Sequence, residues 1–321
     1  MAVSKLFAVR REIPPKTRTI VMIMSFVLPL MIWSLVSYVP FIWHPKVEVT
    51  EPGDAGYFTK GMLVDRDVFN EEVSKLAGEN KTVPEGHRAN PVYLPAPHEV
   101  ATAFYTAFTT EPKRRNENWL HESLWESIQV IFWGFFISSI IGVPLGILCG
   151  TYDFFSKLFE PFVEFFRYLP APAFGALAVA ILGIHSAPKI AIIFIGTFFQ
   201  QVLVVSNTTR KLDPSLLEAA LTLGARRLTL LFRVVVPGII NNLYKDLRIL
   251  LGWAWTYLIV AELIGSSSGI TWFITQQARY KNFDNVYAAI MMIGILGLTT
   301  DLILARLGYR LFPWEREMAK S

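Results

Sequence analysis

The stretch LDPSLLEAALTLGARRLTLLFRVVVPG, residues 212–238, is a polar, basic segment that lies between long apolar runs. Asp213 can cap a first helix, and the proline that follows it suits the first helical turn. Gly224 has the freedom to end this helix at positive φ. A second helix is expected over residues 225–235, and Pro237 is expected to close the unit. The stretch therefore predicts a helical hairpin that offers a docking surface to a partner.

The composition is that of a membrane protein. Hydrophobic residues make up 53% of the chain and charged residues 17%, with a mean hydropathy of +0.40, whereas about a quarter of the residues are charged in soluble domains. The single cysteine, Cys149, lies in an apolar run, so we expect a small buried hydrophobe and no disulfide framework. The histidines are scattered, and no phosphate-binding loop, zinc-protease motif or serine elbow occurs. We expect no catalytic residue, no metal site and no cofactor bound by this chain.

Six apolar runs approach the length of about 20 residues that a helix needs to cross about 30 Å of hydrocarbon. They are residues 20–43, 128–149, 168–187, 190–208, 247–265 and 286–307. The first run is long and lacks a small-residue cleavage site, so we expect a retained helix rather than a signal peptide. A tight turn at residues 185–189 is expected to join the third and fourth runs. The chain is predicted to be an all-α integral membrane protein with six transmembrane helices.

The distribution of Lys and Arg predicts the orientation of these helices, because basic residues collect in cytoplasmic loops. Threading six spans puts most basic residues on one side, including Lys157, Arg167 and those of residues 212–238. That side, which holds both chain ends, is expected to be the cytoplasm. The expected layout starts with a cytoplasmic N-terminal segment (residues 1–19) and a first transmembrane helix (20–44). A periplasmic segment with an insertion and an interfacial helix follows (45–119). The rest is a core of five transmembrane helices with the hairpin (120–310) and a cytoplasmic tail (311–321).

The spacing of residues in the hairpin is similar to a known motif. Glu218, Ala219 and Ala220 are followed after three residues by Gly224, and after nine more by an aliphatic residue, any residue, and an aliphatic residue before Pro237. This pattern resembles the EAA loop of permease subunits of bacterial binding-protein-dependent ABC transporters. Two adjacent alanines would give a shallow helix face that a partner groove can approach closely. For the tripeptide alone, an amphipathic surface helix with an ordinary glycine cap is the alternative.

The resemblance implies a MetI-like, type I ABC importer permease in the bacterial inner membrane. Its expected partners are cytoplasmic ABC ATPase subunits that bind ATP and Mg, a second permease subunit that is identical or different, a periplasmic solute-binding protein and the lipid bilayer, with no nucleic acid. The chain itself would be a non-catalytic transport subunit. The residues that the resemblance assigns to ATPase coupling are Glu218, Ala219, Ala220, Gly224, Ala225, Arg226 and Pro237.

Further segments resemble one branch of these permeases, whose members move nitrate, bicarbonate, taurine and other sulfonates. The segments are LPAP (94–97), LGILCG (145–150), EPFVEFFRYLPAPAFGAL (160–177), LIVAELIGSSSGI (258–270) and IGILGLTTD (293–301). The resemblance covers about residues 94–314 and implies a small anion as the solute. Residues 45–90 depart from the branch and receive no role from it. A contact with a binding protein, packing against a second permease chain and a tolerated surface insertion all remain open for them.

Two helices are expected in the segment after the first span. One is a short helix over residues 67–76 in the insertion. The other starts at Pro97 and has an apolar stripe of Val100, Phe104 and Phe108, which recur every four residues. The stripe is expected to lie in the membrane interface or to pack on neighbouring helices.

Polar and aromatic residues inside the apolar runs are candidates for the solute path, because polar groups in a membrane are costly. Each has a structural alternative: the glutamines could join helices, the aromatic pair could pack on its neighbours, and the glutamate could cap backbone in the turn at 265–269. Arg248 could extend to the interface, and Asp301 could pair with Arg306 or another cation. The path candidates are Gln200, Gln201, Trp253, Tyr257 and Glu262.

Two other classes of protein would also explain the membrane content. A secondary transporter would need inverted repeats, and no second copy of the hairpin is found. A membrane-embedded enzyme would need acid–base or metal-binding residues that converge at one depth, and the ionisable residues here fall at different depths. Neither alternative, which would work without an ATPase partner, accounts for the hairpin.

Overall fold

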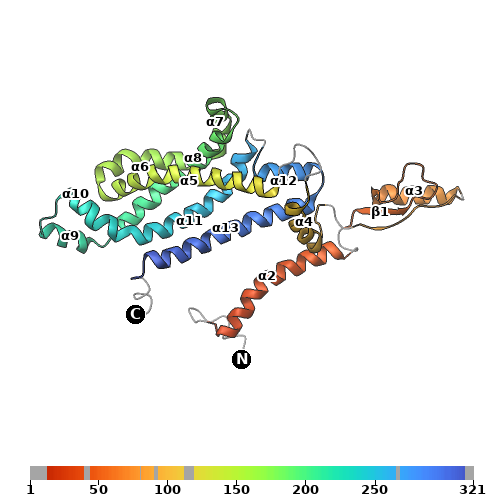
Figure 1. Cartoon of the computed structure of the whole chain (residues 1–321), viewed down its shortest axis with the longest axis horizontal. Helices are drawn as coiled ribbons and strands as arrows, with labels where there is room; N and C mark the ends of the chain where they lie inside the picture. Colours follow the sequence, from red (N-terminus) through yellow and green to blue (C-terminus); the bar gives the residue numbers. More distant parts are fainter. Residues whose placement is uncertain are drawn as a thin grey trace. The chain divides into compact units, whose positions relative to one another are not determined.

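The computed structural model describes residues 13–39, 44–79, 81–89, 93–111, 119–264 and 268–314. The chain divides into two units (Figure 1): a small unit, Met1–Ala107 with Gln277–Ala288, and a large unit, Phe108–Gln276 with Ala289–Ser321. The basic cluster before residue 13, the end of the first predicted span and the C-terminal tail after residue 314 lie outside the described residues.

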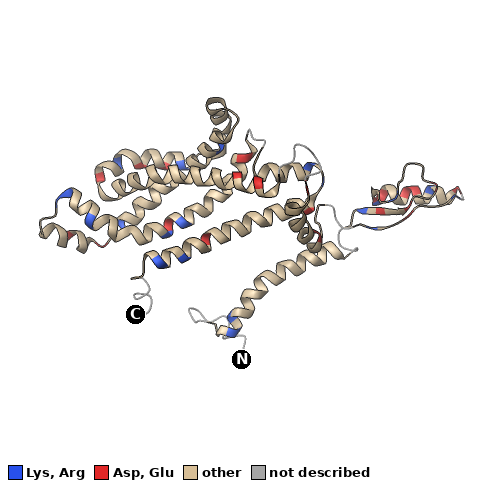
Figure 2. Cartoon of the chain, viewed as in Figure 1, with Lys and Arg blue, Asp and Glu red and all other residues tan. Residues whose placement is uncertain are grey.

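The small unit begins with α2 (Pro15–Tyr38), which corresponds to the first predicted span. Its 24 residues would extend about 36 Å as a helix. Charged residues are confined to its first turn, and the rest of the helix is uncharged in Figure 2. The length and composition of α2 therefore fit a membrane span.

The insertion forms a three-stranded antiparallel sheet covered by one helix. The sheet has the order β2-β1-β3, with β1 (Lys46–Glu51), β2 (Leu63–Asp65) and β3 (Glu85–Arg88), and the helix is α3 (Arg66–Gly78). Every second residue of the first strand is buried, which is the period of a half-buried strand. The prediction of a short helix here is confirmed, but the all-α prediction is wrong for this segment. The core of the insertion comprises Val47, Val49, Ala55, Phe58, Val64, Phe69 and Leu76.

The LPAP segment leads into α4 (Pro97–Thr109), and its backbone carbonyls accept hydrogen bonds from side chains of α2. The indole Nε1 of Trp33 donates to the Pro95 carbonyl at 2.9 Å, and the Ser37 hydroxyl donates to the Leu94 carbonyl at 3.2 Å. The helix begins at Pro97 as predicted, and Val100 of its apolar stripe is buried. The LPAP segment therefore fixes the start of α4 against the first span.

The large unit is built around two parallel helices, α5 (Leu120–Thr151) and α8 (Ser186–Arg210). A Cβ atom on Gly134 would lie 2.7 Å from the Cβ of Ile193, and one on Gly146 would lie 2.7 Å from the Cβ of Val205. Small residues thus let the two backbones approach closely, as in membrane helix pairs. We call this row the glycine ridge; its members are Gly134, Ser138, Gly142, Gly146 and Gly150.

Since α5 and α8 run parallel, the chain between them must return in the opposite direction. The return consists of α6 (Asp153–Arg167), the short 3-10 helix η1 (Ala171–Phe174) and α7 (Gly175–Leu182), with a bend of 89° between the first helix and the rest. The predicted third span at residues 168–187 is therefore wrong in its bounds: α7 has only eight residues, and the helix before the break supplies most of the return. The turn before α8 is also earlier than predicted, and Lys189 lies inside that helix.

Four single helices of the described chain are long and apolar enough to cross a membrane, namely α2, α5, α8 and α13 (Phe283–Leu311). The bent pair of α6 with η1 and α7 is a fifth candidate. The predicted fifth span at residues 247–265 overlaps α11 (Val236–Leu263) and extends past its end. This helix is not among the four because Lys245, Asp246, Arg248 and Glu262 restrict its uncharged stretch. A span in this helix stays a prediction. The described chain also has the short helix α12 (Ile270–Arg279) before α13.

Candidate functional site

The first arm of the hairpin is α9 (Pro214–Thr222), and its two ends are set by local sequence. The carboxylate of Asp213 accepts a hydrogen bond from the Ser215 backbone N–H at 2.9 Å, as an N-cap residue does. This bond, followed by one to the Ser215 side chain, holds the pKa of Asp213 below its usual range. Gly224 has φ of 80°, so the positive angle predicted for it is confirmed.

The second arm differs from the prediction at both of its ends. It begins at α10 (Arg227–Leu230), two residues later than expected, passes through a π-helical turn, η2 (Leu231–Val235), and continues into α11. The prediction that Pro237 closes the unit is wrong, because this proline lies in the first turn of the long helix. Pro237 has no N–H to donate to the fourth residue before it, and the wider π turn accommodates that loss.

The outer side of the hairpin carries exposed apolar side chains, although the segment as a whole is polar and basic. None of the residues of α9 is buried, and Leu223 is 89% exposed. Glu218 and Ala219 of this helix are also exposed, while Ala220 and Ala225 are half-buried. We call the exposed apolar residues the hairpin surface; they are Leu216, Leu221, Leu223, Leu228 and Phe232. The leucines were not among the predicted coupling residues, although their recurrence through the motif is visible in the sequence.

The inner side of the hairpin is attached firmly to the helices of the large unit. Leu231, Val235 and Ile239 pack against Ile147 of α5 and Val205 of α8. Each of these five side chains is at most 7% exposed. Because such a core is close-packed, a force applied to the hairpin is transmitted to both helices.

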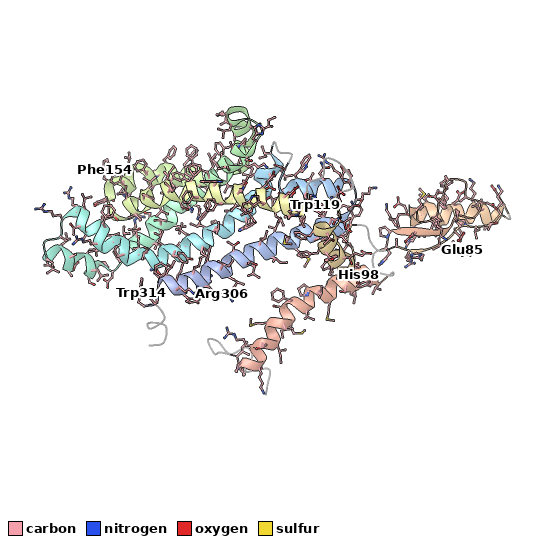
Figure 3. The ribbon with its side chains drawn as sticks, in the orientation of Figure 1. Glu85, His98, Trp119, Phe154, Arg306 and Trp314 are labelled. Atoms are coloured by element: carbon pink, nitrogen blue, oxygen red, sulfur yellow. The ribbon has the colours of Figure 1, made fainter. Side chains whose placement is uncertain are left out.

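Polar contacts hold α6 against the end of α8 that lies next to the hairpin. The Arg210 guanidinium donates to both carboxylate oxygens of Glu160, at 2.5 and 2.7 Å, and the Ser206 hydroxyl donates to the same carboxylate at 2.6 Å. The hydroxyl of Thr208 donates to the carboxylate of Asp246, which joins α8 to α11. The hairpin end of the large unit is therefore a connected network of helices. Figure 3 labels Phe154 near the start of α6.

The structure separates the two adjacent glutamines that were predicted as path candidates. Gln201 is fully buried: its Oε1 accepts from Ser138 at 2.7 Å, and its Nε2 donates to Ser139 at 3.0 Å. It therefore joins α8 to α5, which is the structural alternative. Gln200 is half-buried and lines a hollow that Tyr257 also lines. Only Gln200 of the pair remains a candidate for solute contact.

Glu262 is a backbone cap rather than an open carboxylate. It is 1% exposed, accepts from the Thr271 backbone N–H at 2.7 Å and from the Ser127 hydroxyl at 2.5 Å. The Gly269 backbone passes so close to this carboxylate that any side chain there would collide with it. Nearby, the buried Lys189 donates to the carbonyl and hydroxyl of Ser268 at 3.0 and 3.1 Å. This cluster fixes the start of α12.

The remaining predicted polar residues are placed as follows. Arg248 does not simply extend to the interface: its Nε donates to Asp301 at 2.5 Å, which joins α11 to α13. Asp301 thus has a cation partner other than Arg306. Trp253 is 47% exposed and does not line the hollow that includes Tyr257. Among the described residues, no group of histidine, cysteine, aspartate and glutamate is placed to hold a metal ion.

Comparison with known sequences identifies the chain's relatives. A family described as "Binding-protein-dependent transport system inner membrane component" matches residues 142–313. A probable ABC transporter permease of Brucella abortus is 34% identical over 192 residues, which cover 60% of this chain and 77% of the relative. The taurine transport system permease of Escherichia coli is 29% identical over 229 residues, or 71% of this chain and 82% of the relative. A bicarbonate transport system permease of Synechocystis is 25% identical and covers 56% of this chain and 65% of the relative.

Solved structures support the same fold. An inward-facing methionine ABC transporter has a chain that superposes with a TM-score of 0.55 at 20% identity, covering 60% of this chain and 96% of its own. A bacterial alginate ABC transporter, in complex with a periplasmic protein that holds an alginate pentasaccharide, has a chain with a TM-score of 0.51 at 12% identity. It covers 67% of this chain and 87% of its own.

Proposed function

The chain belongs to the family of binding-protein-dependent transport system inner membrane components, and on that premise we propose that it is the transmembrane permease subunit of an ATP-driven importer. The observation that carries this proposal is the hairpin surface, an exposed apolar patch on a short polar segment whose inner side is packed into the transport helices. The subunit is not an enzyme, because the family supplies the transmembrane component and a separate ATPase hydrolyses ATP.

The hairpin couples the ATPase to the membrane helices mechanically. A cytoplasmic ATPase binds ATP and Mg, and its closure draws the hairpins of two permease subunits together. Because Leu231, Val235 and Ile239 pack on α5 and α8, movement of the hairpin turns these helices as a body. Glu218, Ala219, Ala220 and Gly224 lie in the contact, and Arg226 and Arg227 are polar anchors at its rim. This movement opens the path outward, and hydrolysis lets the hairpins part and reopens it inward.

The assembly that we propose contains two permease subunits, two ATPase subunits and a periplasmic solute-binding protein. The family description names binding-protein-dependent transport. One structural neighbour is an importer in complex with a periplasmic protein. Both termini lie in the cytoplasm in this arrangement, and the insertion lies outside. The second permease is either a copy of this chain or a related subunit.

The solute that we propose is a small anion, such as a sulfonate, nitrate or bicarbonate. Relatives named as taurine, aliphatic sulfonate and bicarbonate permeases support this class. The separate binding protein is expected to contribute most of the selectivity. A ligand screen on that protein identifies the solute directly.

Substitutions in the hairpin surface test the coupling proposal. Leu223→Asp places a charge on the most exposed leucine of the surface, so the amount of ATPase that copurifies with the chain should fall at least about tenfold. ATP-dependent uptake into proteoliposomes should be lost with it. Leu63→Asp is the matched control, since this leucine is 43% exposed on β2 of the insertion and is not part of the hairpin.

The control variant should keep both the ATPase and the uptake. The coupling role is wrong if Leu223→Asp retains the ATPase at the wild-type level. The importer itself is wrong if uptake continues after every partner ATPase has been removed.

A further inference from the structure

A hollow that is open to solvent lies in the large unit at the break between α6 and η1; its empty space, with the solvent-open part included, is about 260 Å³. Aromatic residues contribute to its wall, and Phe166 stacks on Phe199 at a ring distance of 5.2 Å. Three side chains that can donate hydrogen bonds line it from three different helices: Arg167 from α6, Gln200 from α8 and Tyr257 from α11. None of the described residues that line the hollow is acidic.

Arg167 lies far from the hairpin end of the large unit. The contact of Glu160 with Arg210 and the stack of Phe166 on Phe199 show that α6 runs antiparallel to α8 from the hairpin end toward its middle. Arg167 is the last residue of a 15-residue helix, so it lies about 20 Å from the helix start. Arg167 therefore ends a helix rather than lying in a connecting loop, while the side of the membrane on which it lies stays a prediction. It is an exposed charged residue at the break of the bent pair, which is either a broken span or a re-entrant loop. Ionisable groups in such segments are functional candidates.

The polar groups of the hollow are available to a ligand. The Arg167 guanidinium donates to its neighbour, the Tyr168 hydroxyl, at 3.0 Å, and within the described part of the chain it has no carboxylate partner. Most of its five N–H groups therefore remain unused. The side-chain amide of Gln200 and the hydroxyl of Tyr257 likewise form no hydrogen bond to any described residue.

Gly196 lets Tyr257 of α11 approach α8 closely. A Cβ atom at this position would lie 3.0 Å from the ring of Tyr257, so the glycine lets the ring lie directly against α8. Tyr257 thereby lines the same hollow as Gln200. Sequence reasoning named Gln200 and Tyr257 but assigned Arg167 to a loop, because it placed the third span after this residue instead of around it.

We propose that this hollow is an anion-binding station on the solute path, with Arg167 as the charge that selects a small oxyanion and Gln200 and Tyr257 as neutral donors to its oxygens. The proposal rests on the proposed importer function and names the part of the chain that contacts the solute. A guanidinium can hold a carboxylate, sulfonate or nitrate group through two parallel hydrogen bonds.

Charged thiol reagents test this proposal without knowledge of the natural solute. Gln200→Cys places a thiol in the wall of the hollow, and the native Cys149 is 1% exposed and gives little background. The complex that copurifies with its ATPase is treated with a sulfonate-bearing and a trimethylammonium-bearing methanethiosulfonate reagent of similar size. Lys157→Cys, at an exposed position of α6 that does not line the hollow, gives the reference ratio of the two rates.

The ratio of sulfonate to ammonium labelling should be about tenfold higher for the Gln200→Cys variant than for the reference variant, since a cation near the thiol raises the local concentration of an anionic reagent. Adding Arg167→Gln should abolish the preference, and adding Arg167→Lys should keep most of it. Equal ratios at the two positions, no labelling by either reagent, or a preference that survives Arg167→Gln would each overturn the proposal. Failure of the importer function is distinct, since it would appear as no ATPase on the wild-type chain, and the labelling ratio can still be measured there.

Discussion

At the scale of single residues, the direction of a side chain decides whether it builds the protein or faces the solute. Gln200 and Gln201 are neighbours on α8, and successive residues of a helix point about 100° apart. The side chain of Gln201 points toward α5, where its amide oxygen accepts from Ser138 and its amide nitrogen donates to Ser139. The side chain of Gln200 points in a different direction, and this residue lines the hollow. Buried polar groups need such partners, so the serines of α5 explain why Gln201 is tolerated.

Asp213 makes a residue-scale prediction about pH. Its folded pKa is below the ordinary value, so its capping contribution is fully present above the unfolded pKa and is lost as the pH falls through the folded pKa. Asp213→Ala should increase protease cleavage within α9 of the reconstituted chain at neutral pH, and Asp213→Asn should not, because asparagine caps equally well. As the pH falls below the usual range of aspartate, an acid-active protease should begin to cleave the wild type as it does the alanine variant. The asparagine variant should show no such acid transition.

The cap and the glycine of the hairpin were predictable because both depend on a few neighbouring residues. Asp213, the proline after it and Gly224 act within one or two helical turns. The partners and surroundings of Gln200, Arg167 and Glu262 were not predictable in this way, although backbone capping was one of two options for the glutamate. Each depends on a partner or a wall from another helix, such as Ser127, which is 135 positions from the glutamate in sequence.

At the scale of elements, the glycine ridge fixes the arrangement of the large unit. It lets α5 and α8 lie side by side in parallel, and this forces the segment between them to cross back as α6, η1 and α7. Small residues at every fourth position are visible in the sequence over residues 134–150 and are the pattern expected for close membrane helices. The bend in the return segment then creates the hollow at Arg167.

Substitution within the ridge gives an element-scale prediction. A Cβ atom at Gly146 would lie 2.7 Å from the Cβ of Val205 and 2.8 Å from the Val202 carbonyl, so Gly146→Ala must push the two helices apart. The expected loss of stability is about 1–3 kcal/mol, the range for overpacked cores. Thermal unfolding of the chain in detergent should show a lower midpoint. Gly252→Ala in α11, where a Cβ atom meets nothing within 4 Å, is the control and should leave the midpoint unchanged or raise it.

The return segment shows why apolar runs alone misplace an element. Residues 153–167 include Asp153, Lys157, Glu160, Glu164 and Arg167, so no long apolar run is present there. In the structure the carboxylate of Glu160 is neutralised by Arg210 of another helix, which no local pattern reveals. The strands of the insertion were missed for a related reason: they are three to six residues long, and two of them pair with the third across intervening loops.

At the scale of the whole molecule, the two units differ in their relation to the family. The family match at residues 142–313 falls mostly in the large unit and includes the hairpin and all three donors of the hollow. The insertion lies outside that match and has its own hydrophobic core. A change in the insertion is therefore expected to leave the coupling and the anion station intact, which is why Leu63 serves as a control for the hairpin.

The sidedness of the chain is the whole-molecule prediction, because the proposed coupling needs the hairpin in the cytoplasm and the proposed topology puts the insertion on the opposite side of the membrane. Leu223→Cys and Lys60→Cys each introduce a thiol at an exposed position. The native Leu223 is 89% exposed, and the side chain of the native Lys60 is 77% exposed. The native thiol is buried, so an impermeant maleimide reports only the new one. In intact spheroplasts only the variant at position 60 should be labelled, and in inside-out vesicles only the variant at position 223. Permeabilised membranes should label both, which controls for reactivity. Labelling at position 223 from outside would contradict the orientation inferred from the basic residues and, with it, the coupling role of the hairpin, since an ATPase in the cytoplasm could not reach it.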